Sequence, residues 1–484
     1  MAGLAAFACG REEPVFPRAN VVLVSIDTLR ADRLNAYGYR ERTVSPALDR
    51  LTGEGVLFEN HISAAPWTTP SHMSLLTSLH PTAHGVNAPF NELMEALEGG
   101  GRYPRLAGEE DTLAEVLARH GRATAAFTGG ITLDPRIGFA QGFERYDTSM
   151  AKMSEPGFAS IEAWIREHRD GPFFLFWHTF EVHVPYLRGD FLGDELAAAD
   201  AASLAGELGG LRSTEGVPLP VAAERELLES RGQFRFPVVS ALYDAAVLSV
   251  DRWVGRLVDA LRREGLYEST LLVVTSDHGE QLGEEASAGG GRARDGRFYN
   301  AHGHTLYEEM LRVPLIVKLP GGGHAGERVA SVSRAIDVMP TILDVLGLLR
   351  GSGSGQGESL RPRWEGRRRA GPPALSEALA MARESKSLRT DRHKYVVFVG
   401  PGKTSRRGRS FVPRLPVAVE LFDLVADPGE TRNLLASPDV EASRIVARLN
   451  AELRRQVGER RGQAETTVLD DETLERLEAL GYAE

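Results

Sequence analysis

Two acidic side chains and a histidine follow apolar segments that have the composition of buried strands. Asp27 comes directly after 21–26, and Asp277 and His278 come shortly after 271–275. Because the carboxyl ends of strands line the ligand crevice of an open α/β sheet, we expect these three side chains to converge. Two carboxylates and one imidazole suit a single divalent cation such as Ca, Mn, Mg or Zn. An Asp after a strand is more often a turn residue, so the prediction depends on all three together.

A hydroxyl-rich segment at 63–80 contains a candidate nucleophile. Thr69 is expected to cap a helix whose first residue is Pro70, because proline is favoured at that position. Thr68 then lies just outside a helix start, where backbone N–H groups and the helix dipole favour negative charge. A nearby metal would lower the pKa of its hydroxyl, so that Thr68 could attack an anionic ester. A well-capped helix without chemistry explains the segment equally well.

The rest of the chain alternates between strand and helix patterns, which predicts an α/β fold. Near-continuous apolar runs predict strands of a sheet covered on both faces, and they lie at 21–26, 173–177, 271–275 and 313–318. Helical periodicity is clearest at 111–120 and 241–264. Beyond the linker-like 351–373, strands at 387–399 and 418–424 and helices from about 441 to the end predict a smaller α+β subdomain. The predicted units are therefore 1–18, 19–350, 351–373 and 374–484.

Composition limits the class of partner and the compartment. The 484 residues carry a net charge of −11, which argues against nucleic-acid binding. The single cysteine, Cys9, excludes an internal disulfide, and no apolar run reaches the roughly 18 residues of a transmembrane span. Residues 1–10 resemble the tail of a bacterial lipoprotein signal that ends in a lipid-accepting cysteine. This predicts an extracytoplasmic protein, periplasmic or lipid-anchored at Cys9, with a disordered N-terminus and a chance cysteine as the alternative.

Five segments, in chain order, resemble motifs of the sulfatase family within the alkaline phosphatase-like superfamily. They lie at 21–38, 68–77, 274–283, 302–316 and 420–434. The ordered set spans nearly the whole chain and is more specific than any one motif. The resemblance implies an alkaline phosphatase-like sandwich with a large, mostly parallel central sheet and a smaller C-terminal α+β subdomain. It also implies a hydrolase of a small anionic sulfate or phosphate ester, carried on a glycan or a lipid.

The resemblance assigns a role to each site residue. Asp27, Asp277 and His278 become ligands of one divalent metal ion, and Thr68 becomes the nucleophile that also touches this metal. Two-zinc relatives need an aspartate at Thr179, so one metal is expected.

The remaining candidates are histidines and one threonine. His183 matches a histidine that contacts the ester or protonates the leaving oxygen, and its ordinary pKa suits that role; a surface-loop histidine is the alternative. His302, or else His304, would replace a family lysine as an anion contact. His72 and Thr28 occupy the positions of an arginine and of a second acid, so we expect both at the substrate site.

Thr68 also separates this chain from ordinary sulfatases, which oxidise Cys or Ser to formylglycine. The Cβ of threonine already carries a methyl group, so Thr68 can act only as a simple alkoxide. This favours a phosphoester or phosphodiester over a sulfate ester as the substrate. Two alternatives stay open: a degenerate protein that binds an anionic glycan or lipid headgroup without turnover, and a phosphoryl-group transferase.

Overall fold

The computed structural model describes residues 15–88, 92–93, 96, 102–184, 186, 236–282, 302–349, 355–380, 383–399, 416–437, 439–458 and 465–468. Cys9, residues 189–234 and 286–297, and part of the predicted linker at 351–373 lie outside these residues. Among the helices that the structure describes, none has the length and apolar character needed to cross a bilayer.

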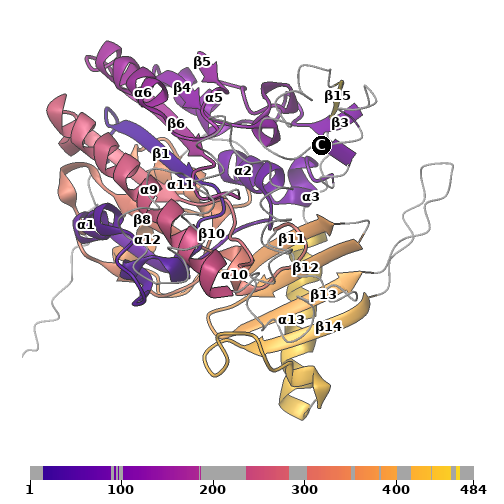
Figure 1. Ribbon diagram of the computed structural model, residues 1–484. Coiled ribbons are helices and arrows are strands. Elements are labelled where there is room, and N and C mark those ends of the chain that lie inside the picture. Colours follow the sequence, from indigo (N-terminus) through magenta and orange to yellow (C-terminus); the bar gives the residue numbers. More distant parts are fainter. Residues whose placement is uncertain are drawn as a thin grey trace, which may run out of the picture.

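A nine-stranded sheet forms the centre of the molecule (Figure 1). The four strands predicted from apolar runs all form, and they are β1 (Asn20–Ile26), β6 (Phe173–Thr179), β7 (Thr270–Thr275) and β8 (Arg312–Lys318). The other five are β2 (Val56–Ile62), β4 (Ala123–Phe127), β5 (Arg145–Asp147), β9 (Arg328–Val329) and β10 (Ser333–Arg334). The order is β10-β2-β8-β7-β1-β6-β4-β5, with β9 beside β2. Only β8 runs antiparallel to its neighbours, which confirms a mostly parallel sheet.

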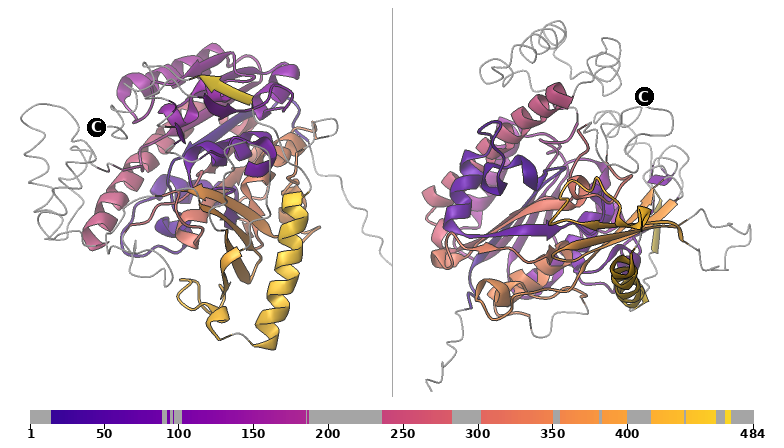
Figure 2. Two further views of the ribbon diagram at one scale, coloured as in Figure 1. Left: turned by 90° about the vertical axis from the view of Figure 1, so that its right-hand side faces the viewer. Right: turned by 90° about the horizontal axis from the view of Figure 1, so that it is seen from below.

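Helices cover both faces of this sheet (Figures 1 and 2). Successive side chains of a strand point to opposite faces, so Val22 and Val24 of β1 join one apolar core while Val21 and Leu23 join the other. The first core is completed by α1 (Pro46–Glu54), α6 (Glu155–Glu167) and α9 (Phe236–Arg263). The second is completed by α2 (Thr68–Thr77), α5 (Leu113–Arg119) and α11 (Val338–Val345). The predicted coverage of both faces is confirmed.

A smaller antiparallel sheet lies against one side of this sandwich (Figure 1). Its strands are β11 (Ala374–Ala380), β12 (Arg383–Arg389), β13 (His393–Val399) and β14 (Pro416–Asp423). One face packs against α13 (Val440–Gly458), as the left view of Figure 2 shows. The other face contacts Leu306 and Met310, which follow His302 in the chain. Ser376 and Glu377 also hydrogen-bond the backbone at Ser63 and Ala64, just before α2. The small sheet therefore braces two segments that lead into the site.

Two local predictions in this region are wrong. The expected single strand at 387–399 is the hairpin β12–β13, which turns where the backbone of Thr390 bonds that of His393. The expected helix after 441 ends at Gly458, and β15 (Glu465–Val468) then pairs with β3 (Arg102–Arg105). The residues of β15, with two threonines and a valine, favour a strand because β-branched side chains fit a pleated surface.

Short helical turns complete the described chain. They are α3 (Pro81–His84), α10 (Glu308–Leu311), α12 (Arg361–Trp364), η1 (Ala31–Arg33), η2 (Asn35–Tyr37), η3 (Ile131–Leu133), η4 (Pro135–Ile137), η5 (Tyr267–Ser269), η6 (Pro320–Gly322), η7 (Ala335–Asp337) and η8 (Leu434–Ala436).

Trp177 tests how strongly the core of the sandwich holds the fold, because it is fully buried in β6. The substitution Trp177→Ala leaves a cavity and should lower the free energy of unfolding, measured by urea denaturation, by about 3–5 kcal/mol. Val425→Ala is the control, since Val425 is 71% exposed, and should change this free energy by less than ~0.5 kcal/mol. Equal effects of the two substitutions would contradict the assignment of Trp177 to the core.

Candidate active site

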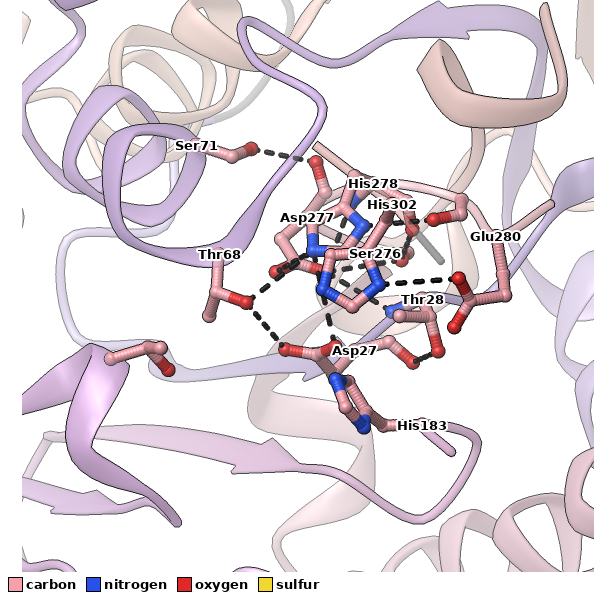
Figure 3. Close-up of polar contacts among 12 residues, drawn as sticks. Asp27, Thr28, Thr68, Ser71, His183, Ser276, Asp277, His278, Glu280 and His302 are labelled. Atoms are coloured by element: carbon pink, nitrogen blue, oxygen red, sulfur yellow. Dashed lines mark hydrogen bonds and ion pairs between the residues drawn. The ribbon is translucent and has the colours of Figure 1, made fainter. Parts of the chain in front are cut away.

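The parallel strands bring the predicted metal ligands to one edge of the sheet. In the register of β1, Ser25 stands beside Thr275 of β7 on one side and beside His178 of β6 on the other. Asp27 and Asp277 therefore leave neighbouring strands at nearly the same level. One ligand atom from each of Asp27, Asp277 and His278 lies within 4.8 Å of the others, and all three residues are buried (Figure 3). The expected convergence is confirmed.

The electrostatics of this cluster fit a divalent cation. Among the described residues, Asp27 Oδ1 and Asp277 Oδ2 are buried but have no hydrogen-bond partner. Burial raises the pKa of Asp27 to about 7, and burial together with the charge of Asp27 raises the pKa of Asp277 to about 8. Two such carboxylates resist joint ionisation unless positive charge lies between them. Burial also holds the pKa of His278 well below its ordinary value, which keeps the ring in its neutral, metal-binding form.

Thr68 lies beside these ligands at the start of α2. The predicted cap is wrong: the helix begins at Thr68, its N-cap is Trp67, and Thr69 instead donates to the carbonyl oxygen of Thr132 at 2.7 Å. Thr68 Oγ1 donates to Asp27 Oδ2 at 3.2 Å and lies 3.4 Å from His278 Nε2 (Figure 3). The hydroxyl therefore contacts two of the three candidate ligands at a helix N-terminus.

Two further histidines meet at the same place. The ring centroids of His183 and His302 are 5.0 Å apart, and His302 is also 4.5 Å from the ring of His278. Burial opposes the charge on His302, but Glu280, whose Oε1 is 3.2 Å from its Nδ1, leaves the pKa of His302 above its ordinary value. Burial and the charge of His302 hold the pKa of His183 well below its ordinary value. The expectation of an ordinary pKa for His183 is therefore wrong, and His302 is the ring that favours a proton.

The other three predicted residues have hydrogen-bond partners within the protein. The hydroxyl of Thr28 donates to the carbonyl oxygen of Asp27 at 2.7 Å, and its backbone N–H donates to Asp277 Oδ1 at 3.3 Å. His304 Nε2 pairs with Gln281 Oε1 at 2.9 Å. His72 is fully buried, and both of its ring nitrogens are engaged by protein groups. Contact of these side chains with a substrate stays a prediction.

Sequence reasoning missed two residues of the cluster. His178 is fully buried in β6, and its Nε2 lies 3.2 Å from Asp27 Oδ2. Glu280 is also fully buried and supports His302. The signal for His178 was a polar residue near the end of an apolar strand, and the signal for Glu280 was an acid three positions after Asp277.

Comparison with known proteins agrees with this geometry. The family model named Sulfatase matches residues 19–348. The multifunctional alkaline phosphatase superfamily protein PehA of Trinickia caryophylli is 28% identical over 409 residues, covering 68% of this chain and 74% of PehA. An ulvan-active sulfatase of Formosa agariphila is 26% identical over 478 residues, covering 92% of this chain and 82% of the sulfatase. The crystal structure of a phosphonate monoester hydrolase of Agrobacterium radiobacter shares the fold with a TM-score of 0.63 at 23% identity, covering 91% and 96% of the two chains.

The raised pKa of Asp277 makes a prediction about stability. Its folded-state value of about 8 exceeds the ordinary 3.8, so the metal-free fold holds a proton that the unfolded chain releases between these values. The free energy of unfolding should therefore fall as pH rises through this interval, and Asp277→Asn should make this fall smaller, measured by urea denaturation in the presence of a chelator.

The same variant tests metal binding. At pH near 8, Mn²⁺ should raise the melting temperature of the wild type but not of Asp277→Asn.

Asp259→Asn is the control for this experiment, because the Asp259 side chain is 64% exposed. It should behave as the wild type does in both measurements. A melting temperature of Asp277→Asn that responds to Mn²⁺ as the wild type does would exclude Asp277 as a ligand.

Proposed function

Because this chain belongs to the sulfatase family of ester hydrolases, we propose that it cleaves a small anionic ester with Thr68 as its nucleophile. Asp27, Asp277 and His278 would hold one divalent cation. The observation that carries the proposal is the position of Thr68 Oγ1, 3.2 Å from Asp27 Oδ2 and 3.4 Å from His278 Nε2. A cation at these ligands would lower the pKa of the hydroxyl and polarise the ester.

The proposed reaction has two displacements, the first by Thr68 and the second by water. In the first, Thr68 Oγ1 releases its proton along the hydrogen bond to Asp27, bonds to the central phosphorus or sulfur, and the bond to the leaving oxygen breaks. His302, the ring that favours a proton and lies beside His183, gives one to that oxygen. In the second, water returns a proton to His302 and attacks the same centre, the bond between that centre and Thr68 breaks, and Asp27 gives the threonine oxygen its proton back. Backbone N–H groups at the start of α2 favour the anionic group throughout.

The threonine side chain favours phosphorus over sulfur as the centre attacked. Its methyl group prevents oxidation to formylglycine, so the covalent product is an ordinary threonine ester that water must clear. Metal-assisted clearance is established chemistry for phosphoryl groups. We therefore propose a phosphoester or phosphodiester as the preferred substrate, on a glycan or a lipid. The names of two similar proteins, a phosphonate monoester hydrolase and a multifunctional alkaline phosphatase superfamily protein, support this direction.

Binding without turnover is the second candidate. The observation that favours it is that His72 and Thr28, which occupy positions of charged family residues, have hydrogen bonds within the protein. A pure binder, however, would not need a hydroxyl between a buried carboxylate, Asp27, and a buried imidazole, His278. A phosphoryl transferase would use the same first displacement with another acceptor in place of water.

Thr68→Ala tests the nucleophile. It should reduce kcat by at least about 10³-fold, because the covalent route is lost, while the affinity for Mn²⁺ measured by calorimetry stays close to that of the wild type. Thr68→Ser is the matched control, since it keeps the hydroxyl and should keep measurable turnover. Mass spectrometry of quenched wild-type reactions should find the adduct on the peptide that contains Thr68. An adduct on another residue would refute this assignment.

A substrate panel tests the chemistry of the ester. Metal-supplemented protein should hydrolyse 4-nitrophenyl phosphodiesters or phosphate monoesters with a higher kcat/KM than 4-nitrophenyl sulfate. Aryl sulfate as the best substrate would contradict the preference for phosphorus. Binding of esters with no product would favour the binder, and product that appears only with an added alcohol acceptor would favour the transferase.

A further inference from the structure

Two buried imidazoles lie behind the candidate metal ligands, one on each of two elements. His72 comes from α2 and His178 from β6. Their ring centroids are 4.8 Å apart and their planes meet at 88°, an edge-to-face contact. Both rings are fully buried. Phe176 makes an edge-to-face contact with His72, and Phe180 makes one with His178.

The hydrogen-bond partners of His72 determine which of its nitrogens carries the proton. Nδ1 lies 3.0 Å from the carbonyl oxygen of Thr68, which can only accept, so Nδ1 must be the donor. The same nitrogen lies 3.3 Å from Asp277 Oδ2. Nε2 lies 2.9 Å from the hydroxyl of Ser25, which can therefore donate to it. A neutral ring with its proton on Nδ1 satisfies both hydrogen bonds, to Thr68 and from Ser25, while Nδ1 also lies close to the candidate ligand Asp277 without a hydrogen bond to it.

His178 makes a hydrogen bond to the other carboxylate, that of Asp27. Its Nε2 lies 3.2 Å from Asp27 Oδ2, and an ionised carboxylate can only accept, so Nε2 is the donor. The same oxygen of Asp27 also accepts from Thr68. Asp27 Oδ1 is then the oxygen left for a cation, since it has no hydrogen-bond partner among the described residues. Ser25 of β1 links the two histidines, because it stands directly beside His178 in the strand register and its hydroxyl bonds His72.

We propose that His72 and His178 are positioning residues: His178 orients Asp27 toward the cation through its hydrogen bond, and His72 lies beside Asp277 and holds the start of α2. The inference rests on the proposed function, because it assumes that these carboxylates are metal ligands. A neutral donor orients a carboxylate and leaves its full negative charge for the metal. An arginine, which the family motif has at the position of His72, would instead bring a permanent positive charge beside Asp277. Such outer partners of metal ligands typically change metal affinity by about 10- to 100-fold.

The test compares pairs of substitutions at each histidine. His178→Leu removes the donor, whereas the amide nitrogen of His178→Gln can reach the position of Nε2. His72→Leu and His72→Asn form the same pair for Nδ1. We expect the leucine variants to raise the Kd for Mn²⁺, measured by calorimetry on folded protein, by about 10- to 100-fold. The amide variants should recover much of this loss, which a role in packing alone would not predict.

His61→Leu is the matched control, because His61 is also fully buried and its Nδ1 pairs with Ser333 at 2.9 Å. It should lower the melting temperature without changing the Kd for Mn²⁺. If the wild type binds Mn²⁺ and the leucine variants at 72 and 178 match His61→Leu in affinity, the positioning role is refuted and the proposed function stands. If the wild type binds neither Mn²⁺ nor Zn²⁺, both proposals fail together.

Discussion

The site depends on the repulsion between two buried carboxylates. β1 and β7 are neighbouring parallel strands, and Asp27 and Asp277, which follow them, lie together at one buried position at the edge of the sheet. Burial raises the pKa of both groups, which measures how poorly the fold tolerates their charges. A protein gains nothing from this arrangement unless a cation joins it, because uncompensated buried charge is costly. The neighbouring rings of His72 and His178 would orient these two carboxylates without neutralising most of their negative charge.

The backbone beside the carboxylates is held in a strained form. Thr28 has a φ of 60°, which is unfavourable for a β-branched residue and costs about 1–3 kcal/mol. The conformation points its N–H at Asp277 Oδ1, while Tyr243 donates to its carbonyl oxygen at 2.7 Å. Ser276 accepts from the N–H of Leu29 at 3.0 Å, which joins the ends of the two strands. The strain therefore serves to orient a candidate metal ligand, and packing from α9 maintains it.

The small sheet contributes to the site from a distance. Its contacts with Leu306 and Met310 hold the segment that carries His302, and its bonds to Ser63 and Ala64 hold the approach to α2. His302 then contacts His183, and Thr68 donates to Asp27. The proposed nucleophile and the proposed proton donors thus come from three separate parts of the chain, so the reaction that we propose needs both sheets to be in place.

The sequence alone determined the main strands, the residue types of the candidate metal ligands and the chemistry open to the candidate nucleophile. Near-continuous apolar runs specify buried strands because both faces of the sheet are covered, and Asp27 and Asp277 follow such runs directly. The methyl group of Thr68 is a property of the residue itself. Tertiary structure decided the roles of His72 and His178, since their partners come from other elements: Ser25 lies 47 residues from His72, and Asp27 lies 151 residues from His178. A ring that can donate or accept takes its role from its neighbours, and only folding brings those neighbours together.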